Sequence, residues 1–145
     1  MRTAPPQRCC AWQEDGGPAL VLPGRPWAVR LAGRDPAFGA LEVYEADVLL
    51  DVVTSTRIAP LLLRGARAAN GRAGPCILAW GRLPISGAGP EVEFTLGRRR
   101  PFMQPGTVLR LTSWCWLAVA DGRFDRVTVR SGDACVRSRI RQGQP

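Results

Sequence analysis

Short apolar runs recur along this chain, and glycine and proline separate them at intervals of about 8–15 residues. This spacing is typical of all-β domains. We therefore expect a single β domain over 19–140, preceded by a flexible arm at 1–18 and followed by a tail at 141–145. The predicted strands are 19–22, 27–32, 41–53, 58–63, 76–83, 91–97, 107–119, 124–130 and 134–140.

Two of these runs show how the alternation is interpreted. In 91–97, Val92 and Phe94 fall on the side opposite Glu91 and Glu93, as in a strand with one buried face. The run 41–53 changes parity near Val43–Tyr44, so a β-bulge there would align its apolar side chains. A helix starting at Pro36 is the alternative, but it would place Glu42 and Glu45 against its apolar stripe, which favours a strand.

The segment from Thr107 to Arg130 is predicted to form a hairpin, because two β-rich runs flank Asp121–Gly122. A two-residue loop would mix apolar and charged side chains on both faces. A three-residue loop over Ala120–Gly122 gathers the apolar side chains on one face, so we predict that register. The other face would then carry Arg110, Thr112, Trp114, Trp116, Phe124, Arg126, Thr128 and Arg130.

That predicted face combines aromatic rings with arginines, which is the chemistry of a surface for single-stranded nucleic acid. Aromatic rings stack on bases, and arginines neutralise phosphates. The alternative is that a second sheet, formed by 19–32 and 41–53, packs on this face and makes Trp114 and Trp116 part of the core. The candidate binding residues are Arg98, Arg99, Arg100, Arg110, Trp114, Trp116, Phe124, Arg126 and Arg130.

Charge is distributed unevenly along the chain. All 20 basic residues are arginine, and the net charge is +8. Residues 1–54 carry a net charge of −2 and residues 55–145 a net charge of +10. Arginine clusters occur at 64–72, predicted as a flexible loop, at 98–100 and at 137–141. A GC-rich genome would favour arginine, but the asymmetry also indicates a polyanionic partner or an acidic protein surface.

The residues that are missing exclude several kinds of chemistry. Without histidine there is no Ser-His-Asp triad and no imidazole metal ligand, and without lysine there is no Schiff base or Walker-type loop. The five cysteines show no Cys-x-x-Cys spacing, and Cys76 and Cys115 lie in apolar runs that predict buried thiols. We therefore expect no enzymatic activity, no metal and no cofactor.

No secretory signal is recognisable in the first 18 residues, which include Arg2, Arg8, Glu14 and Asp15. No uncharged apolar stretch approaches the roughly 20 residues needed to cross a bilayer. These features predict an intracellular protein of a reducing compartment, without a membrane partner.

For the fold, we expect an embellished OB-like Greek-key barrel, with 41–53 as its first strand, 76–83 and 91–97 as the next pair, and 107–130 as the last hairpin. The alternative is a two-layer β-sandwich, since the barrel leaves 19–32 and 58–63 unassigned. The barrel predicts a non-enzymatic module that binds single-stranded nucleic acid, or a subunit of a nucleic-acid-associated complex. The sandwich predicts an assembly subunit or protein-interaction adaptor, for example in a virus particle or regulatory complex.

Overall fold

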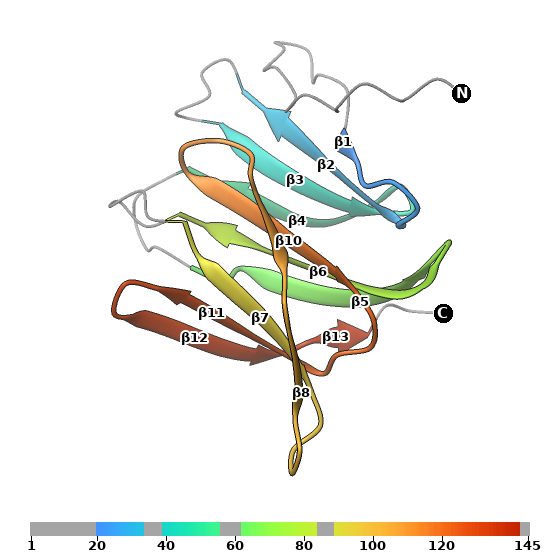
Figure 1. Ribbon diagram of the computed structural model, residues 1–145. Coiled ribbons are helices and arrows are strands. Elements are labelled where there is room, and N and C mark those ends of the chain that lie inside the picture. The colour runs from blue at the N-terminus through green and yellow to red at the C-terminus, as the bar shows by residue number, and fades with distance from the viewer. Residues whose placement is uncertain (1–19, 34–38, 56–61, 84–88, 143–145) are drawn as a thin grey trace, which may run out of the picture.

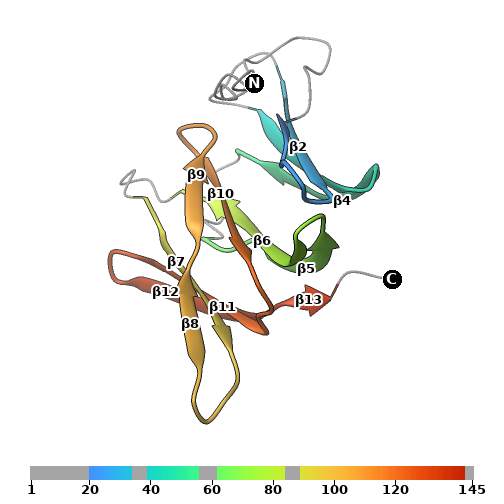
Figure 2. The ribbon, with the colours of Figure 1, turned by 45° about the vertical axis from the view of Figure 1, so that its right-hand side comes forward.

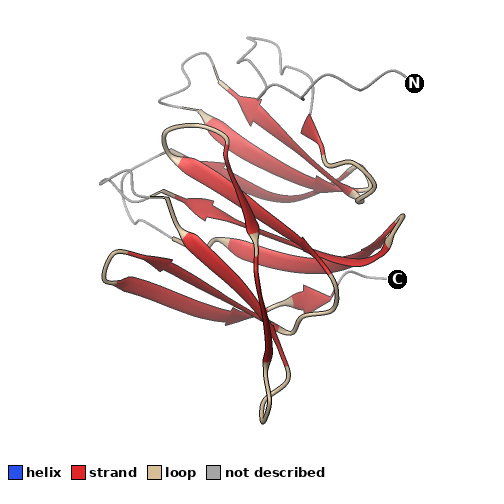
Figure 3. Ribbon diagram, in the orientation of Figure 1, coloured by secondary structure: helices blue, strands red, loops and turns tan. Residues whose placement is uncertain are grey.

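The computed structural model describes residues 20–33, 39–55, 62–83 and 89–142. Within these ranges the chain is all-β, as the sequence predicts, with thirteen strands in three sheets and no helix (Figure 3). The predicted arm at 1–18 lies outside the described residues. The three sheets, which we call A, B and C, are stacked in layers from top to bottom of Figure 1.

Sheet A is an antiparallel meander formed by the N-terminal strands β1 (Leu20–Val21), β2 (Trp27–Ala32), β3 (Ala40–Glu45) and β4 (Val48–Thr54). The single strand predicted over 41–53 is wrong, because Ala46 and Asp47 form a turn between β3 and β4 with φ of 46° and 66°. Two consecutive positive φ angles are typical of a two-residue hairpin turn. The register between β3 and β4 does shift at Val43/Tyr44, where a bulge was predicted.

Sheet B lies in the middle and has the strand order β13-β5-β6-β10-β9. Its two central strands are buried on both faces, since every residue from Cys76 to Gly81 and from Cys115 to Ala120 is buried. A strand covered on both sides has a continuous apolar sequence rather than an alternating one. The strands are β5 (Gly65–Gly71), β6 (Gly74–Arg82), β9 (Thr107–Arg110), β10 (Cys115–Asp121) and β13 (Arg141–Gln142).

Sheet C covers the other face of sheet B and has the order β12-β11-β7-β8. Its strands are β7 (Glu91–Leu96), β8 (Phe102–Pro105), β11 (Arg126–Ser131) and β12 (Ala134–Arg139). Val127 and Val129 of β11 face inward and are fully buried, whereas Arg126 and Arg130 lie on the outer face. This alternation is expected of a sheet with one solvated side.

Two apolar cores separate the three layers. The core between sheets A and B includes Trp27, Leu41, Leu78 and Leu117, and the core between sheets B and C includes Ile77, Phe94, Trp116 and Val129. The buried thiols of Cys76 and Cys115 belong to the first core, as predicted.

The chain returns from sheet C to sheet B at two places. β8 pairs with β7 in sheet C, and after Gly106 the chain continues as β9, which pairs with β10 in sheet B (Figure 2). A Cβ atom at Gly106 would lie 2.8 Å from the Phe94 ring and 3.3 Å from the Ala118 Cβ atom, so this crossing requires glycine. β12 likewise continues past buried Ile140 into β13.

The hairpin predicted over Thr107–Arg130 is wrong. β10 pairs with β6 and β9, whereas β11 pairs with β7 and β12 in a different sheet. The turn that reverses the chain is the one before β10, where the Trp114 amide donates to the Thr112 hydroxyl at 3.2 Å. Because β10 is buried on both faces, it has no polar face for the predicted register to expose.

Several other expectations need correction. The described strands form three sheets instead of one closed barrel, so the OB arrangement is not confirmed, and three layers replace the two of the sandwich. The predicted loop at 64–72 contains strand β5. Residues 58–61 of the predicted strand 58–63 lie outside the described part, and Leu62 and Leu63 are not in a strand. The predicted tail begins with β13, which pairs in parallel with β5.

Candidate functional site

The aromatic platform predicted on the 107–130 segment is part of the core. Trp114, Trp116 and Phe124 expose 8%, 0% and 3% of their surface. Trp114 belongs to the core between sheets A and B, and Trp116 to the core between sheets B and C. The Trp116 Nε1 donates to the Leu62 carbonyl at 2.9 Å, which satisfies its buried N–H group. These tryptophans therefore cannot stack on a ligand.

An exposed aromatic ring does occur, at a position that the sequence reasoning missed. Phe102, at the start of β8, exposes 60% of its surface. Its ring stacks on Phe124 with centroids 6.3 Å apart and planes 20° apart, and Phe124 in turn lies 5.7 Å from Phe94. The three rings form a row from the core to the surface, which we call the phenylalanine row. The buried rings hold Phe102 in place, so its free face is presented without a large loss of side-chain entropy.

Three arginines lie shortly before this ring in the chain, in the turn that leads into β8. Arg98, Arg99 and Arg100 connect β7 to β8 and are all exposed. The turn lies at the end of the β7–β8 hairpin, on the side of the molecule away from sheet A (Figures 1 and 2). No ion pair involves these three arginines among the residues that the structure describes. Their charges are therefore available to an external anion.

The segment before β11 anchors this turn. The Gly97 amide donates to the Asp125 carboxylate at 3.3 Å, and the Asp125 amide donates to the Thr95 carbonyl at 2.9 Å. Arg126 donates from Nη2 to the Gly97 carbonyl and from Nε to Asp125 at 3.4 Å. Gly97 has a φ of 90°, a conformation that glycine adopts without strain. The base of the arginine turn is thus fixed although its side chains are exposed.

Further arginines continue from Arg126 across the outer face of sheet C. Arg126 of β11 lies directly opposite Arg139 of β12, and Thr128 lies opposite Arg137. Side chains that are direct partners in an antiparallel pair share one face. Arg139 and Arg141 then line a cavity together with Arg64 and Arg67. We call Arg98, Arg99, Arg100, Arg126, Arg139 and Arg141 the arginine track.

The remaining predicted arginines are placed differently. Arg130 lies on the outer face of β11, opposite Cys135 and Glu91. Arg110 lies on β9, at the edge of sheet B, and is exposed. The structure therefore brings Arg98, Arg99, Arg100, Phe124 and Arg126 together, and leaves Arg110, Trp114 and Trp116 outside this group.

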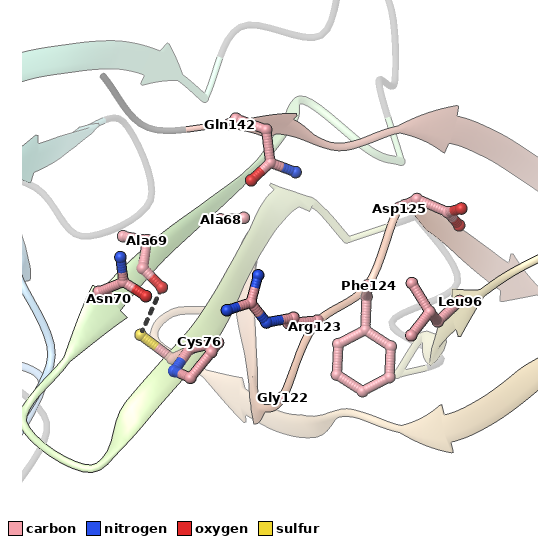
Figure 4. A pocket seen from close by; sticks show the side chains of 11 residues that line it. Ala68, Ala69, Asn70, Cys76, Leu96, Gly122, Arg123, Phe124, Asp125 and Gln142 are labelled. Carbon is pink, nitrogen blue, oxygen red and sulfur yellow. Dashed lines mark hydrogen bonds between the residues drawn. The ribbon is translucent and has the colours of Figure 1, made fainter. Parts of the chain in front are cut away.

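A cavity of about 390 Å³ lies beside the phenylalanine row, between the β5–β6 hairpin and the segment 122–125. Figure 4 shows the Arg123 side chain extending into it, with the amide side chains of Asn70 and Gln142 nearby. Cys76 also lines it and donates to the Ala69 carbonyl with an Sγ to O distance of 3.6 Å. Burial raises the pKa of the Cys76 thiol, so this group is not an activated nucleophile.

Arginines near sheet A are neutralised by carboxylates. Glu45 accepts from Arg67 at 2.9 and 3.0 Å and from the Trp27 Nε1 at 2.9 Å. Asp51 accepts from Arg64 at 3.0 and 3.1 Å and from the Trp80 Nε1 at 2.9 Å. Donation of these hydrogen bonds to Asp51 raises the pKa of Arg64 above its ordinary value. These two pairs join sheet A to sheet B.

One sequence signal could have identified Phe102. The order Arg98-Arg99-Arg100-Pro101-Phe102-Met103 directly follows an alternating strand, so it places two large apolar side chains beside a charged turn. Phe102 pairs with Leu96 and therefore lies on the same face of sheet C as Phe94. It is at the end of the hairpin, beyond the core. The sequence analysis assigned no strand to residues 98–106, so it made no prediction for this ring.

Other kinds of site are not apparent in the described ranges. No group of three or more Cys, Asp or Glu side chains there is arranged to hold a metal ion. The part of the chain that the structure describes also has no helix with the length and apolarity that crossing a membrane requires. Comparisons of this chain with protein-family models, with curated proteins and with solved structures return no match.

Proposed function

We propose that this chain is a non-enzymatic module that binds single-stranded nucleic acid on its β7–β8 hairpin. The observation that carries the proposal is the phenylalanine row, which ends in the exposed ring of Phe102. Next to it are three exposed arginines that form no ion pair with any described residue. A base that is free of a duplex can stack on this ring, while the guanidinium groups bind its phosphates. The buried Phe124, predicted as a contact residue, acts here as the support of Phe102.

The arginine track extends this surface beyond one nucleotide. Arg126 contacts the turn through the Gly97 carbonyl, and Arg139 is its direct partner on β12. A strand that leaves Phe102 along sheet C would therefore meet further cations. Binding of this kind neutralises several phosphates and weakens as salt increases.

A first experiment tests the role of the ring. Fluorescence anisotropy with a labelled oligothymidylate would give the Kd of the wild type, of Phe102→Ala and of Met103→Ala. Met103 is a suitable control because it is adjacent and 55% exposed, but it pairs with Thr95 on the outer face. Loss of one stacked base costs about 1–3 kcal/mol, so Phe102→Ala should weaken binding roughly 5- to 150-fold and Met103→Ala by far less.

A second experiment tests the contribution of the arginines by measuring how binding depends on salt concentration. Arg98→Ser/Arg99→Ser and the control Arg72→Ser/Arg110→Ser remove the same charge from exposed positions. The first pair should lower the slope of log Kd against log salt by about 1.4, because each phosphate contact to a single strand contributes about 0.7. Absence of binding by the wild type at low salt, or equal effects of the two double variants, would overturn the proposal.

A second candidate function is that of an assembly subunit or protein-interaction adaptor. It is favoured by β12, an edge strand whose six residues are all exposed. An edge strand with one free side can accept a strand from a partner. Light scattering of the purified chain distinguishes the two candidates: a discrete oligomer without nucleic acid supports the adaptor, and a monomer that binds oligonucleotide supports the module.

A further inference from the structure

The arginine track ends in a second cavity, of about 320 Å³, where all three sheets contribute residues. β12 and β13 supply Arg139 and Arg141, and Arg67 of β5 is the direct partner of Arg141 in the parallel pair. Leu50 and Asp51 come from sheet A, and the buried Trp80 comes from sheet B. Four guanidinium groups thus surround one cavity, since Arg64 also lines it.

Two of these four arginines are already neutralised. Arg64 binds Asp51, and Arg67 binds Glu45, in each case through Nε and Nη2. Asp51 is the only carboxylate among the described residues that line the cavity, and it also accepts from the Trp80 Nε1 and from the Val52 amide. Its oxygens are therefore occupied, and its charge is compensated by Arg64. Each paired guanidinium still has three N–H groups free, because arginine carries five.

The other two arginines supply the excess charge. Arg139 and Arg141 are exposed and form no ion pair with any residue that the structure describes. The cavity therefore has an excess of two positive charges, together with free donors on Arg64 and Arg67. A phosphate monoester carries a charge of about −1.5 to −2 at neutral pH, whereas a phosphodiester carries −1.

We propose that this cavity binds a phosphate dianion, held by Arg139 and Arg141 and by the remaining donors of Arg64 and Arg67. The dianion is either the terminal phosphate of a nucleic acid strand or a free phosphomonoester. The first source rests on the proposed function, because Arg139 joins the cavity to the arginine track. The second does not depend on it.

The test begins with inorganic phosphate. The melting temperature of the full chain is measured against phosphate concentration and compared with sodium chloride at the same ionic strength. A ligand that binds only the folded state raises the melting temperature with concentration in a saturable way. We expect such stabilisation with phosphate beyond that of the salt.

Variants then assign the site. Arg139→Gln/Arg141→Gln should raise the Kd for phosphate roughly tenfold or more, because charge-assisted hydrogen bonds are lost. Arg130→Gln/Arg137→Gln removes the same charge from the outer face of sheet C and should leave this Kd nearly unchanged. All four residues are exposed, so neither double variant should unfold the protein. No saturable effect of phosphate, or equal effects of the two variants, would overturn the proposal.

Oligonucleotides distinguish the two sources. Anisotropy compares strands of one sequence with a 5′-phosphate, a 3′-phosphate or no terminal phosphate. Tighter binding of one phosphorylated strand, lost in Arg139→Gln/Arg141→Gln, identifies a strand end. Phosphate binding without such a preference identifies a free phosphomonoester. Binding of the strand without a terminal phosphate tests the hairpin alone, so failure of the proposed function is seen separately.

Discussion

Sheets A and C cover opposite faces of the same central sheet, yet they use charged side chains in opposite ways. In sheet A, Glu45 and Asp51 each bind an arginine of sheet B or of the segment leading into it. In sheet C, Glu91 lies directly opposite Arg130, and no ion pair forms between them. The same residue types therefore join two layers on one side and form a solvated, predominantly basic surface on the other.

Burial explains the difference. The side chains of Glu45 and Asp51 are only 15% and 16% exposed, and each accepts an indole N–H as well as a guanidinium. A carboxylate that is mostly removed from water must have such partners, because an unpaired charge there is costly. Glu91 is exposed and remains hydrated, so it gains little from pairing. Arginines near sheet A are thus structural. Among the described residues, the exposed arginines near sheet C other than Arg126 form no ion pair and are available to a ligand.

The largest effect is expected from Trp116→Ala, which tests whether sheet C is packed as described. This side chain is fully buried in the core between sheets B and C and donates to the Leu62 carbonyl. Removal of a buried Trp costs about 3–5 kcal/mol, so the free energy of unfolding in urea should fall by that amount. Unchanged stability would contradict the layered arrangement. Phe102→Ala is the control, because its exposed ring should contribute far less to stability.

A smaller effect is expected when the carboxylates of the two sheets are compared directly. Asp51→Asn removes the charge that holds Arg64 and weakens the bond from Trp80. Hydrogen bonds to charged groups contribute about 1.5–3 kcal/mol, so the free energy of unfolding should fall by about 2–3 kcal/mol. Glu91→Gln should stay within about 0.5 kcal/mol of the wild type. Equal losses in the two variants would remove the distinction between the sheets.

The smallest effect is a loss of stability at high pH, which we expect when the Cys115 thiol ionises in the core between sheets A and B. Desolvation raises the pKa of Cys115 from 9.0 to about 11. The folded state therefore binds this proton more tightly than the unfolded state, so the stabilisation is complete below pH 9 and is lost as the pH rises to 11. This rise in the pKa of the Cys115 thiol corresponds to a loss of about 2 kcal/mol in the free energy of unfolding by pH 11.

The measurement is urea denaturation at pH 8 and pH 11 for the wild type and Cys115→Ala. The wild type should lose more stability between the two pH values than the variant, since other titrating groups are common to both. Cys135 lies on exposed β12 and provides the contrast. It should react with an alkylating reagent in the native protein at pH 8, whereas Cys115 should react only after unfolding. Rapid native labelling of Cys115 would contradict its burial.

Local patterns predicted the strands well where one face of a strand is buried. The alternation of Glu91 with Val92 and of Glu93 with Phe94 depends only on near neighbours, and β7 follows it. The same reasoning failed for β10, because a strand buried on both faces contains no information about its partner. It also failed at Ala46–Asp47, since alanine rarely adopts the positive φ that the first position of this turn requires.

The candidate site was partly predictable. The arginine triplet at 98–100 is evident in the sequence, and an exposed turn is the expected place for it. The aromatic partner was assigned to Trp114 and Trp116, because the wrong hairpin register placed them on a polar face. Phe102 was missed because residues 98–106 lay between two predicted strands and were assigned no element, whereas the structure places Phe102 at the start of β8 with its ring exposed.

The sequence by itself determined that the chain is all-β, that its cations are all arginine, and that the positive charge is concentrated after residue 54. Only the tertiary structure decided which arginines are neutralised. The pairs Arg64–Asp51, Arg67–Glu45 and Arg25–Asp121 join residues that are 13, 22 and 96 positions apart. The strand partners and the order of the layers were likewise decided only by the tertiary structure. Both depend on contacts between distant segments, whereas hydrophobic periodicity reports only which way each side chain faces along its own strand.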